Sequence, residues 1–326
     1  MENIRSFGIV GLGKMGADLA LNALHHGYGV VGMDTHAVAG DLTGKGLQAA
    51  TDAKQLAALL TPPRFVIMYV PAGPPVDAVL AELADNLQPG DIIADGGNSY
   101  WGDSIRRHAR LKAKGIYFID AGTSGGPGGA LDGACFMIGG EDAAVAMIEP
   151  ILRKLAVEGG FVHAGGPGAG HFTKLVHNGI EFGMLQAIGE GLSLLENYRE
   201  HLPVADVLSC WRHGSVIRSW LVDLMETMYR KQGGLDKIPA FVDDTGEVNW
   251  LVDDALHMEV PIPVITQSVV QLVASRDGRH DASRAIAMMR HGFGGHPYGP
   301  STNIAHERHT GRVGGFVGKS GNGAAP

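Results

Sequence analysis

Four side chains that can transfer protons or form hydrogen bonds lie at helical spacing in the middle of the chain. Positions i, i+3, i+4 and i+7 of one predicted helix hold Lys174, His177, Asn178 and Glu181. Residues at this spacing share one helix face. An amine whose pKa is lowered by burial can accept an alcohol proton during hydride transfer, and a carboxyl group of raised pKa can return one. The pattern predicts an acid–base site, although a solvated polar face would have the same spacing.

A glycine-rich turn near the start of the chain indicates a dinucleotide site. The sequence GLGKMG at 11–16 follows an apolar run and precedes a helical pattern. Gly11 would allow a tight turn, Gly13 would let the backbone approach a pyrophosphate, and Gly16 would let the helix pack closely on the strand. The helix amino terminus would direct its free N–H groups at the phosphates. A purely structural turn is the alternative, but the strand–turn–helix setting favours the dinucleotide.

Asp34 favours NAD over NADP as that dinucleotide. It follows the next apolar run, 18 residues after Gly16, where a carboxylate can accept hydrogen bonds from a ribose 2′-hydroxyl. Its negative charge would repel the 2′-phosphate of NADP. The following Thr35 and His36 supply no guanidinium to pair with that phosphate. We therefore expect NAD as the cofactor, with NADP as the less favoured alternative.

Two further loops are expected at the same site. The sequences DGGNS at 95–99 and GTSGGPGGA at 122–130 each follow a strand-like run. Open α/β sheets bind ligands at the carboxyl ends of their strands. The N–H groups and hydroxyls of these loops would suit an anionic ligand, although each string alone is also compatible with an ordinary turn.

Short apolar runs alternate with helical patterns in the first half of the chain, and helical patterns alone follow. This order predicts a Rossmann-like, doubly wound α/β sheet and then an all-α domain. Strand-like runs lie at 7–10, 30–33, 65–70, 92–94, 117–119, 137–139 and 161–163. Helical patterns lie at 18–26, 52–60, 76–87, 104–114, 141–155, 171–196, 204–232, 248–256, 264–275 and 282–290. The predicted domains are a dinucleotide-binding domain at 1–168, a helical substrate and dimerisation domain at 169–310 and a glycine-rich tail at 311–326.

Composition excludes several classes of function. The formal net charge is −8, which argues against a nucleic-acid or membrane-surface partner. No run of about 18 apolar residues predicts a membrane span. The first strand-like run begins too early to leave room for a signal peptide. The two distant cysteines, Cys135 and Cys210, form neither a metal-ligand spacing nor a disulfide framework, so we expect a cytoplasmic protein with both thiols buried in its core.

Taken in chain order, the motifs resemble those of the 6-phosphogluconate dehydrogenases. They are GLGKMG, VPAG at 70–73, DGGNS, TSGG at 123–126 and KLVHNGIE at 174–181. The resemblance spans nearly the whole chain, whose 326 residues match the short form of this family within the β-hydroxyacid dehydrogenase superfamily. It implies oxidative decarboxylation of 6-phosphogluconate to ribulose 5-phosphate and CO2, without a metal, in the pentose phosphate pathway and gluconate utilisation.

The resemblance also implies roles for individual residues. Lys174 would be the base at C3 of the substrate, and Glu181 would be the acid at C1. His177 and Asn178 would hold substrate hydroxyls. Other substrate contacts would come from Asn98, Ser124, Gly125, Gly126, Arg290 and His296. Cofactor contacts would come from Gly11, Leu12, Gly13, Met15, Gly16, Asp34, Val70, Ala72 and Asn98.

The sequence RHGFGGH at 290–296 resembles the tail with which the family binds the substrate phosphate, in many members from the neighbouring subunit. Arginine suits this role because its guanidinium contacts a phosphate through two hydrogen bonds. A capping arginine at a helix end is the alternative. We expect a homodimer or homotetramer whose tails complete neighbouring sites, because the helical half is too elongated to bury its own apolar faces.

Three features depart from the family pattern. Phe182 follows the expected acid, where the family often has tyrosine. The stretch TGEVNW at 245–250 lacks the lysine of the matching loop in the long forms. Leu272 stands where the long forms place a phosphate-binding arginine, with only Arg276 and Arg279 nearby. A related aldonate or a differently phosphorylated substrate therefore remains an alternative.

Two other classes of protein share parts of this pattern. A β-hydroxyacid dehydrogenase or semialdehyde reductase, without decarboxylation, would explain Lys174 and Asn178 but gives no role to Glu181 or to 290–296. A non-catalytic dinucleotide-binding regulator would need no acid–base set at all.

Overall fold

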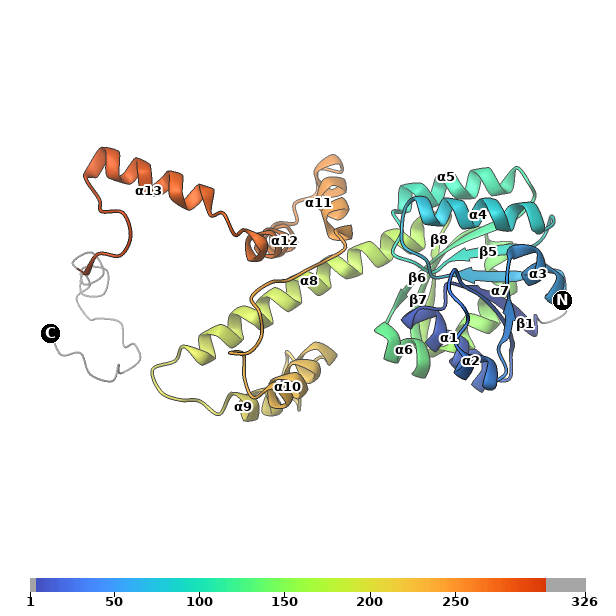
Figure 1. Ribbon diagram of the computed structural model, residues 1–326, viewed down its shortest axis with the longest axis horizontal. Coiled ribbons are helices and arrows are strands. Elements are labelled where there is room, and N and C mark those ends of the chain that lie inside the picture. Colours follow the sequence, from blue (N-terminus) through green and yellow to red (C-terminus); the bar gives the residue numbers. More distant parts are fainter. Residues whose placement is uncertain (1–3, 303–326) are drawn as a thin grey trace. The chain divides into compact units, whose positions relative to one another are not determined.

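The computed structural model describes residues 4–302, apart from the side chain of Pro127 (Figure 1). The predicted tail at 311–326 lies outside these residues. The chain divides into two compact units, and each is described by itself. The first comprises the residues up to Gly179 together with Gly246–Asp254, and the second comprises Ile180–Thr245 and the residues from Ala255 onward.

The first unit is built on one eight-stranded sheet of order β3-β2-β1-β4-β5-β6-β7-β8. Its strands are β1 Ser6–Val10, β2 Gly29–Met33, β3 Gln48–Ala50, β4 Phe65–Met68, β5 Ile92–Asp95, β6 Tyr117–Ser124, β7 Ala134–Gly139 and β8 Ala156–Gly165. All neighbouring strands run parallel except β6 and β7, which are antiparallel. The predicted Rossmann-like class is confirmed.

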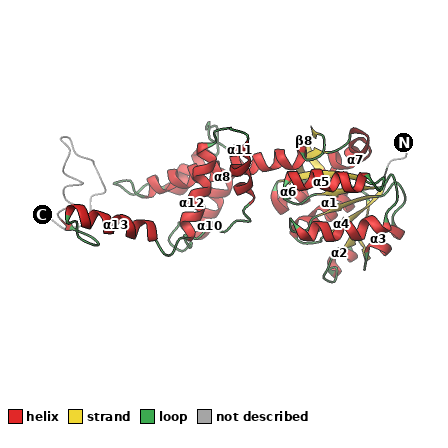
Figure 2. Ribbon diagram, turned by 90° about the horizontal axis from the view of Figure 1, so that it is seen from above, coloured by secondary structure: helices red, strands yellow, loops and turns green. Residues whose placement is uncertain are grey.

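Helices cover both faces of this sheet (Figure 2). They are α1 Lys14–His25, α2 Gly40–Gly44, α3 Ala53–Leu59, α4 Pro74–Asn86, α5 Trp101–Lys112, α6 Gly126–Asp132 and α7 Asp142–Leu155. Successive side chains of a strand point to opposite faces, so continuous apolar strands fill two cores. Phe65 and Ile67 of β4 pack with α1 and α7, whereas Val66 and Met68 pack with α3, α4 and α5.

The reversal at β7 follows from the short link that precedes it. Strand β6 ends at Ser124 and β7 begins at Ala134, with only α6 between them. A parallel crossover needs a dozen or more residues, so this link returns the chain antiparallel. Gly125 and Gly133 flank α6 with φ of +118° and +130°, which only glycine adopts readily. The sequence did not predict α2, β3 or α6, because each is too short for its periodicity to be recognised.

The second unit is helical. Its helices are α9 Val204–Trp211, α10 Trp220–Gln232, α12 Pro263–Arg276 and α13 Asp281–Gly294, and α8 Ala169–Glu196 and α11 Glu247–His257 each contribute residues to both units. The single helix expected at 204–232 is two helices. Gly214, at φ +69°, interrupts it, and the hydroxyl of Ser219 caps α10 by accepting a hydrogen bond from the Val222 N–H at 3.3 Å.

Both cysteines are exposed, so the expectation that they are buried is wrong. Cys135 points away from the core because it alternates with the buried Phe136 along β7. Val204 and Leu208 are four residues apart and therefore share the buried face of α9. Cys210 lies on another face of this helix.

Helices α12 and α13 leave most of their apolar side chains exposed. Ser268 is the one buried residue of α12, and α13 has none. Within residues 4–302 no helix is both long enough and apolar enough to cross a bilayer.

Candidate active site

The glycine turn between β1 and α1 leaves room for a ligand. A Cβ atom at Gly11 would lie 2.3 Å from the Tyr69 carbonyl oxygen, and one at Gly16 would lie 1.9 Å from the Gly11 carbonyl oxygen. A Cβ at Gly13 would meet nothing within 4 Å. Gly13 directly precedes α1 and has no side chain that could cap the first N–H groups of the helix. These residues fit a dinucleotide whose pyrophosphate lies against Gly13 and the start of α1.

Asp34 is tied to the same turn. Its Oδ2 accepts a hydrogen bond from the Leu12 N–H at 2.6 Å, and its Oδ1 accepts one from the His36 N–H at 2.9 Å. Burial alone would raise the pKa of Asp34, but the hydrogen bonds from His36 and Leu12 outweigh it and lower the pKa. A negative charge therefore stands beside the turn, where the ribose of the dinucleotide is expected.

The first turn of α8 is docked on β6 and β7 through glycines. A Cβ at Gly170 would lie 2.4 Å from the Asp120 carbonyl oxygen, and one at Gly139 would lie 2.5 Å from the Gly170 nitrogen. The buried Asp120 carboxylate caps the helix by accepting hydrogen bonds from the Gly168 and His171 N–H groups, both at 2.8 Å. The backbone of α8 therefore lies in direct contact with the backbones of β6 and β7. We call these contacts of Gly139 and Gly170, together with the contact of Gly122 with Lys174, the glycine dock.

Lys174 is set directly over β6 by this dock. A Cβ at Gly122 would lie 2.5 Å from the Lys174 Cβ. The Lys174 side chain is buried, and its Nζ donates a hydrogen bond to Asn178 Oδ1 at 2.7 Å. His177 Nδ1 lies 3.5 Å from the same Nζ, and its Nε2 lies 3.0 Å from the Ser124 hydroxyl at the end of β6. The amine, amide and imidazole therefore meet at the carboxyl edge of the sheet.

Helix α11 contributes a carboxyl group that the sequence did not single out. The Nδ2 of Asn178 donates to Oε1 of the buried Glu247 at 3.5 Å. At the other end of the segment, the buried Asp254 accepts hydrogen bonds from the Tyr100 hydroxyl at 3.0 Å and the Trp101 indole N–H at 2.7 Å. Segment 246–254 therefore joins α8 to the start of α5. The sequence predicts a helix at 248–256 and contains the string at 245–250, but its pattern assigns no role to Glu247 or Asp254.

Tyr69, also not predicted, connects three strand ends. Its ring fills the space beside Gly96, where a Cβ would lie 2.6 Å from the ring Cζ. Its hydroxyl lies 3.1 Å from Thr123 Oγ1 on β6. Burial raises the pKa of Tyr69 well above its usual value, so its hydroxyl stays protonated. The carboxyl ends of β4, β5 and β6 are thereby fixed against one another.

The loop at 95–99 presents one side chain outward. The buried Asp95 accepts hydrogen bonds from the Ser99 hydroxyl at 2.7 Å and from the Gly97 N–H at 3.1 Å. Asn98 between them is exposed. A Cβ at Gly97 would lie 3.0 Å from the Val70 carbonyl oxygen, so this loop adjoins the one at 70–73. The Ser99 hydroxyl is thus used inside the loop, and Asn98 faces the solvent.

The remaining predicted site residues are distributed as follows. Leu12 and Met15 pack partly buried against the core, Ala72 is exposed, and Gly125 and Gly126 open α6 with positive φ. Glu181, Arg290 and His296 belong to the second unit. Glu181 is partly buried and lies on α8 beyond Asn178. Arg290 is exposed near the end of α13, and the partly buried His296 follows its glycine cap.

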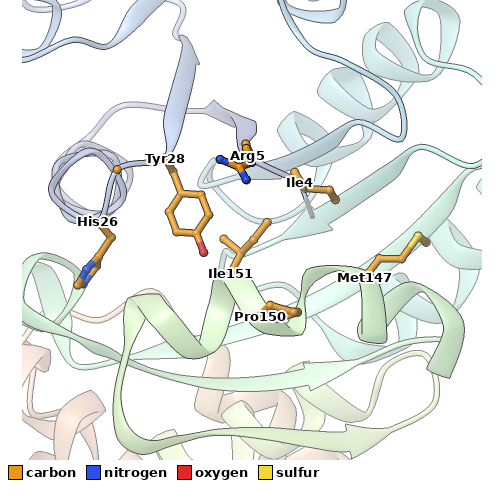
Figure 3. A pocket seen from close by; sticks show the side chains of 8 residues that line it. Ile4, Arg5, His26, Tyr28, Met147, Pro150 and Ile151 are labelled. Carbon is orange, nitrogen blue, oxygen red and sulfur yellow. The ribbon is translucent and has the colours of Figure 1, made fainter. Parts of the chain in front are cut away.

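A shallow pocket of about 260 Å³ lies away from these residues (Figure 3). It is lined by Ile4, Arg5, His26, Gly27, Tyr28, Met147, Pro150 and Ile151. Arg5 precedes β1 and Tyr28 precedes β2, so the pocket lies at the amino ends of these strands. It contains none of the predicted site residues and adjoins the edge of the sheet opposite the glycine turn.

Comparison with known proteins gives consistent matches. The model for the NAD binding domain of 6-phosphogluconate dehydrogenase matches residues 6–165, and the model for the 6-phosphogluconate dehydrogenase C-terminal domain matches residues 170–306. A Bacillus subtilis protein, provisionally named 6-phosphogluconate dehydrogenase YqeC, is 43% identical over 89% of this chain and 97% of its own length. The NAD(+)-dependent, decarboxylating 6-phosphogluconate dehydrogenase of Haloferax volcanii is 37% identical over 89% of this chain and 97% of its own length. The solved structure of Plasmodium falciparum 6-phosphogluconate dehydrogenase is 26% identical, with a TM-score of 0.76 over 91% of this chain and 67% of that chain.

Proposed function

Since this chain belongs to the 6-phosphogluconate dehydrogenase family, we propose that it converts 6-phosphogluconate to ribulose 5-phosphate and CO2 with reduction of NAD. The observation that carries the proposal is the buried Lys174–Asn178 pair, joined through His177 to Ser124 at the carboxyl edge of the sheet. The glycine turn opens at the same edge. An acid–base group and a dinucleotide site on one sheet edge suit the oxidation of an alcohol.

The residues around Lys174 support the first step. Lys174 accepts the proton of the C3 hydroxyl, and Asn178, an uncharged partner 2.7 Å away, orients the amine in either protonation state. Bound NAD supplies the hydride acceptor. His177, held by Ser124, and Asn178 bind the substrate hydroxyls.

The later steps also use groups on α8. Oxidation at C3 leaves a 3-keto acid, and the protonated Lys174 donates a hydrogen bond to its carbonyl while the carboxylate leaves as CO2. The enediol that remains needs a proton at C1. Glu181 supplies it in the proposed mechanism. The carbonyl is the electron sink of the decarboxylation, so no metal enters the proposal.

Asp34 supports NAD as the preferred cofactor. Its lowered pKa keeps the carboxylate ionised, and an ionised carboxylate accepts from a free 2′-hydroxyl but repels a 2′-phosphate. The next basic residue after Asp34, other than His36, is Lys45, and no arginine lies between them. A guanidinium that could pair with a 2′-phosphate is therefore lacking in this segment.

We include assembly into a homodimer or homotetramer in the proposal, with residues 290–296 serving the site of a neighbouring subunit. Large apolar side chains on α12 and α13 support it. They are Val264 at 70%, Met288 at 66%, Met289 at 61% and Phe293 at 76% exposure. Exposed apolar surface of this kind marks protein interfaces. A cytoplasmic location completes the proposal, in keeping with two cysteines that form no disulfide.

Initial rates with 6-phosphogluconate, measured with NAD and NADP in parallel and with trapping of CO2, test the activity. We expect NADH, ribulose 5-phosphate and CO2 in equal amounts, and a higher kcat/KM with NAD. Formation of NADH without CO2 would instead assign the chain to the non-decarboxylating β-hydroxyacid dehydrogenases.

A further inference from the structure

A buried aspartate lies at each end of strand β5, one just before the strand and one as its last residue. Each aspartate is paired with an arginine. Asp91 directly precedes the strand and pairs with Arg64, whose Nη1 lies 2.9 Å from Asp91 Oδ2. Asp95 ends the strand and pairs with Arg107 of α5, whose Nη1 lies 3.7 Å from Asp95 Oδ2. Both aspartates are fully buried. The first pair lies at the amino edge of the sheet, and the second lies at the carboxyl edge, where the site is.

Arg107 also contacts groups other than Asp95. Its Nη2 donates to the Gly73 carbonyl oxygen and to Asp77 Oδ2, both at 3.1 Å, and its Nε donates to Asp77 Oδ1 at 3.3 Å. The side chain is only 2% exposed. Its hydrogen bonds are the main reason that the pKa of Asp77 is lowered. The guanidinium therefore contacts three chain segments through one planar group. It hydrogen-bonds to Gly73 and Asp77, and its Nη1 forms an ion pair, without a hydrogen bond, with Asp95.

Two of those segments are the loops that border the proposed site. Gly73 ends the loop at 70–73 and caps α4 with φ +88°. Asp95 fixes the loop at 95–99, because it binds the Gly97 N–H and the Ser99 hydroxyl on either side of Asn98. The first loop is expected to contact the cofactor, and the second is expected to contact the substrate. The Arg107 side chain itself is buried behind the Gly73 carbonyl and the Asp95 carboxylate.

We propose that Arg107 is a positioning residue that sets the spacing between the loops at 70–73 and 95–99. It thereby sets the approach of the substrate to the nicotinamide ring. A guanidinium has five N–H donors in a fixed plane and can hold the Gly73 carbonyl, Asp77 and Asp95 together. An ammonium is a point charge on a flexible stem and cannot hold all three. The inference rests on the proposed dehydrogenase activity, but it also predicts an effect on ligand binding alone.

Arg107→Lys and Arg107→Met test this proposal, with Arg64→Lys and Arg64→Met as matched controls. Arg64 also binds a carbonyl oxygen, that of Ala57 at 2.9 Å, besides its aspartate. The measurements are kcat, KM, Tm and the dissociation constants of NADH and ADP-ribose, which lacks the nicotinamide ring. We expect all four variants to lower Tm. Only the Arg107 variants should lower kcat, by about 10- to 100-fold, because a misplacement near 1 Å has effects of this size.

Binding separates positioning from general damage. The affinity of the Arg107 variants for NADH should fall, while their affinity for ADP-ribose stays within about twofold of the wild type, since the glycine turn and Asp34 are not in contact with Arg107. Arg107→Lys retains the charge and serves if Arg107→Met does not fold.

Wild-type kcat and NADH affinity in Arg107→Lys would overturn the proposal, as would an equal loss of kcat in Arg64→Lys or a parallel loss of ADP-ribose affinity. A wild-type protein that makes no NADH from 6-phosphogluconate would refute the proposed function instead. The comparison of NADH with ADP-ribose would then still decide the role of Arg107.

Discussion

The position of the Lys174 side chain is fixed by residues on two sides. Beneath it, Gly122 offers no side chain, and one helical turn further on, Asn178 accepts its hydrogen bond at 2.7 Å. Replacing Lys174 by Met should lower kcat by about 10²- to 10⁴-fold, because the acid–base group is lost. NADH affinity should change little. Steady-state rates and a fluorescence titration with NADH measure the two effects.

The control for this variant is Glu190→Gln, an exposed position on the same helix. It changes a charge on α8 without touching the hydrogen-bonded cluster. A similar loss of kcat in both variants would argue against the role of Lys174.

A single residue, Asp34, is also expected to determine the choice between NAD and NADP. Asp34→Ser removes the charge that would repel a 2′-phosphate and a hydrogen bond worth about 1.5–3 kcal/mol. We expect kcat/KM with NAD to fall by about 10- to 100-fold and the NADP-to-NAD ratio of kcat/KM to rise. Initial rates with both cofactors give the ratio. An unchanged ratio would remove Asp34 as the determinant.

The pH dependence of this preference follows from the direction of the pKa shift. Folding lowers the pKa of Asp34, so the carboxylate is ionised at every pH above its usual range and gains a proton only in stronger acid. The preference for NAD should therefore be constant between about pH 7 and pH 9. A cofactor ratio that varies across this range would show that another group, titrating near neutrality, controls it.

At this scale the sequence predicted most readily the residues that share one element, and it missed Glu247 and Tyr69, whose contacts lie far away in the chain. Lys174, His177 and Asn178 were found because helical spacing places them on one face. Glu247 was missed because its contact with Asn178 joins positions 69 residues apart. Tyr69 was missed for the same reason, since a tyrosine after a strand carries no signal of the Thr123 hydroxyl that it meets.

At the scale of elements, α11 joins α8 to α5 through the buried carboxyl groups of Glu247 and Asp254. Burial and the hydrogen bond to Asp254 raise the pKa of Tyr100, which keeps that hydroxyl a donor. Asp254→Ala leaves the Tyr100 hydroxyl and the Trp101 indole N–H without their acceptor, which costs about 1–3 kcal/mol of unfolding free energy for each group left unpaired. Urea unfolding followed by tryptophan fluorescence measures this loss.

Asp253→Ala is the matched control, because the neighbouring Asp253 is exposed. We expect its unfolding free energy to change by less than about 0.5 kcal/mol. Equal destabilisation by the two variants would mean that Asp254 does not hold the segment.

The glycine dock gives another prediction at this scale. Gly122→Ala would place a methyl group 2.5 Å from the Lys174 Cβ, so either β6 or α8 must move. We expect kcat to fall by more than about 10-fold, since displacements near 1 Å suffice for larger losses. Gly128→Ala on α6 is the control, because a Cβ there meets nothing within 4 Å. Wild-type kcat in Gly122→Ala would show that the dock does not set the position of Lys174.

Elements with a long, regular pattern were predicted well, and short ones were not. The buried strands and α8 were read from continuous apolar runs and helical spacing. The direction of β7 depended on the length of the link before it, and the break between α9 and α10 depended on Gly214, which a pattern of apolar residues does not weigh.

At the scale of the whole molecule, apolar side chains on α13 predict assembly. Light scattering should give at least the mass of a dimer for the wild type. Phe293→Asp places a charge on a helix with no buried residue, so it should not unfold the subunit but should weaken assembly. Leu59→Asp, at an apolar residue of α3 that is 42% exposed, is the control. A wild-type monomer that is fully active would contradict this prediction.

The boundary between the two compact units depends on contacts between distant segments. The sequence places a boundary near Gly168, where α8 begins, because the strand pattern stops there. The two compact units part within α8, after Gly179, and residues 246–254 return to the first unit. A sequence pattern reports which residues are apolar, but it does not report which distant segment will cover them.

The glycine dock also bears on how this protein could acquire a new substrate. At Gly122, Gly139 and Gly170 a Cβ atom would lie 2.5, 2.5 and 2.4 Å from a neighbouring atom, so the position of the Lys174 amine relative to the sheet depends on the absence of side chains at these three positions. A larger side chain at any of these positions would therefore displace the proposed base. We expect new specificity to arise instead at solvent-facing positions such as Asn98, where a change of side chain does not alter the contact between α8 and the sheet.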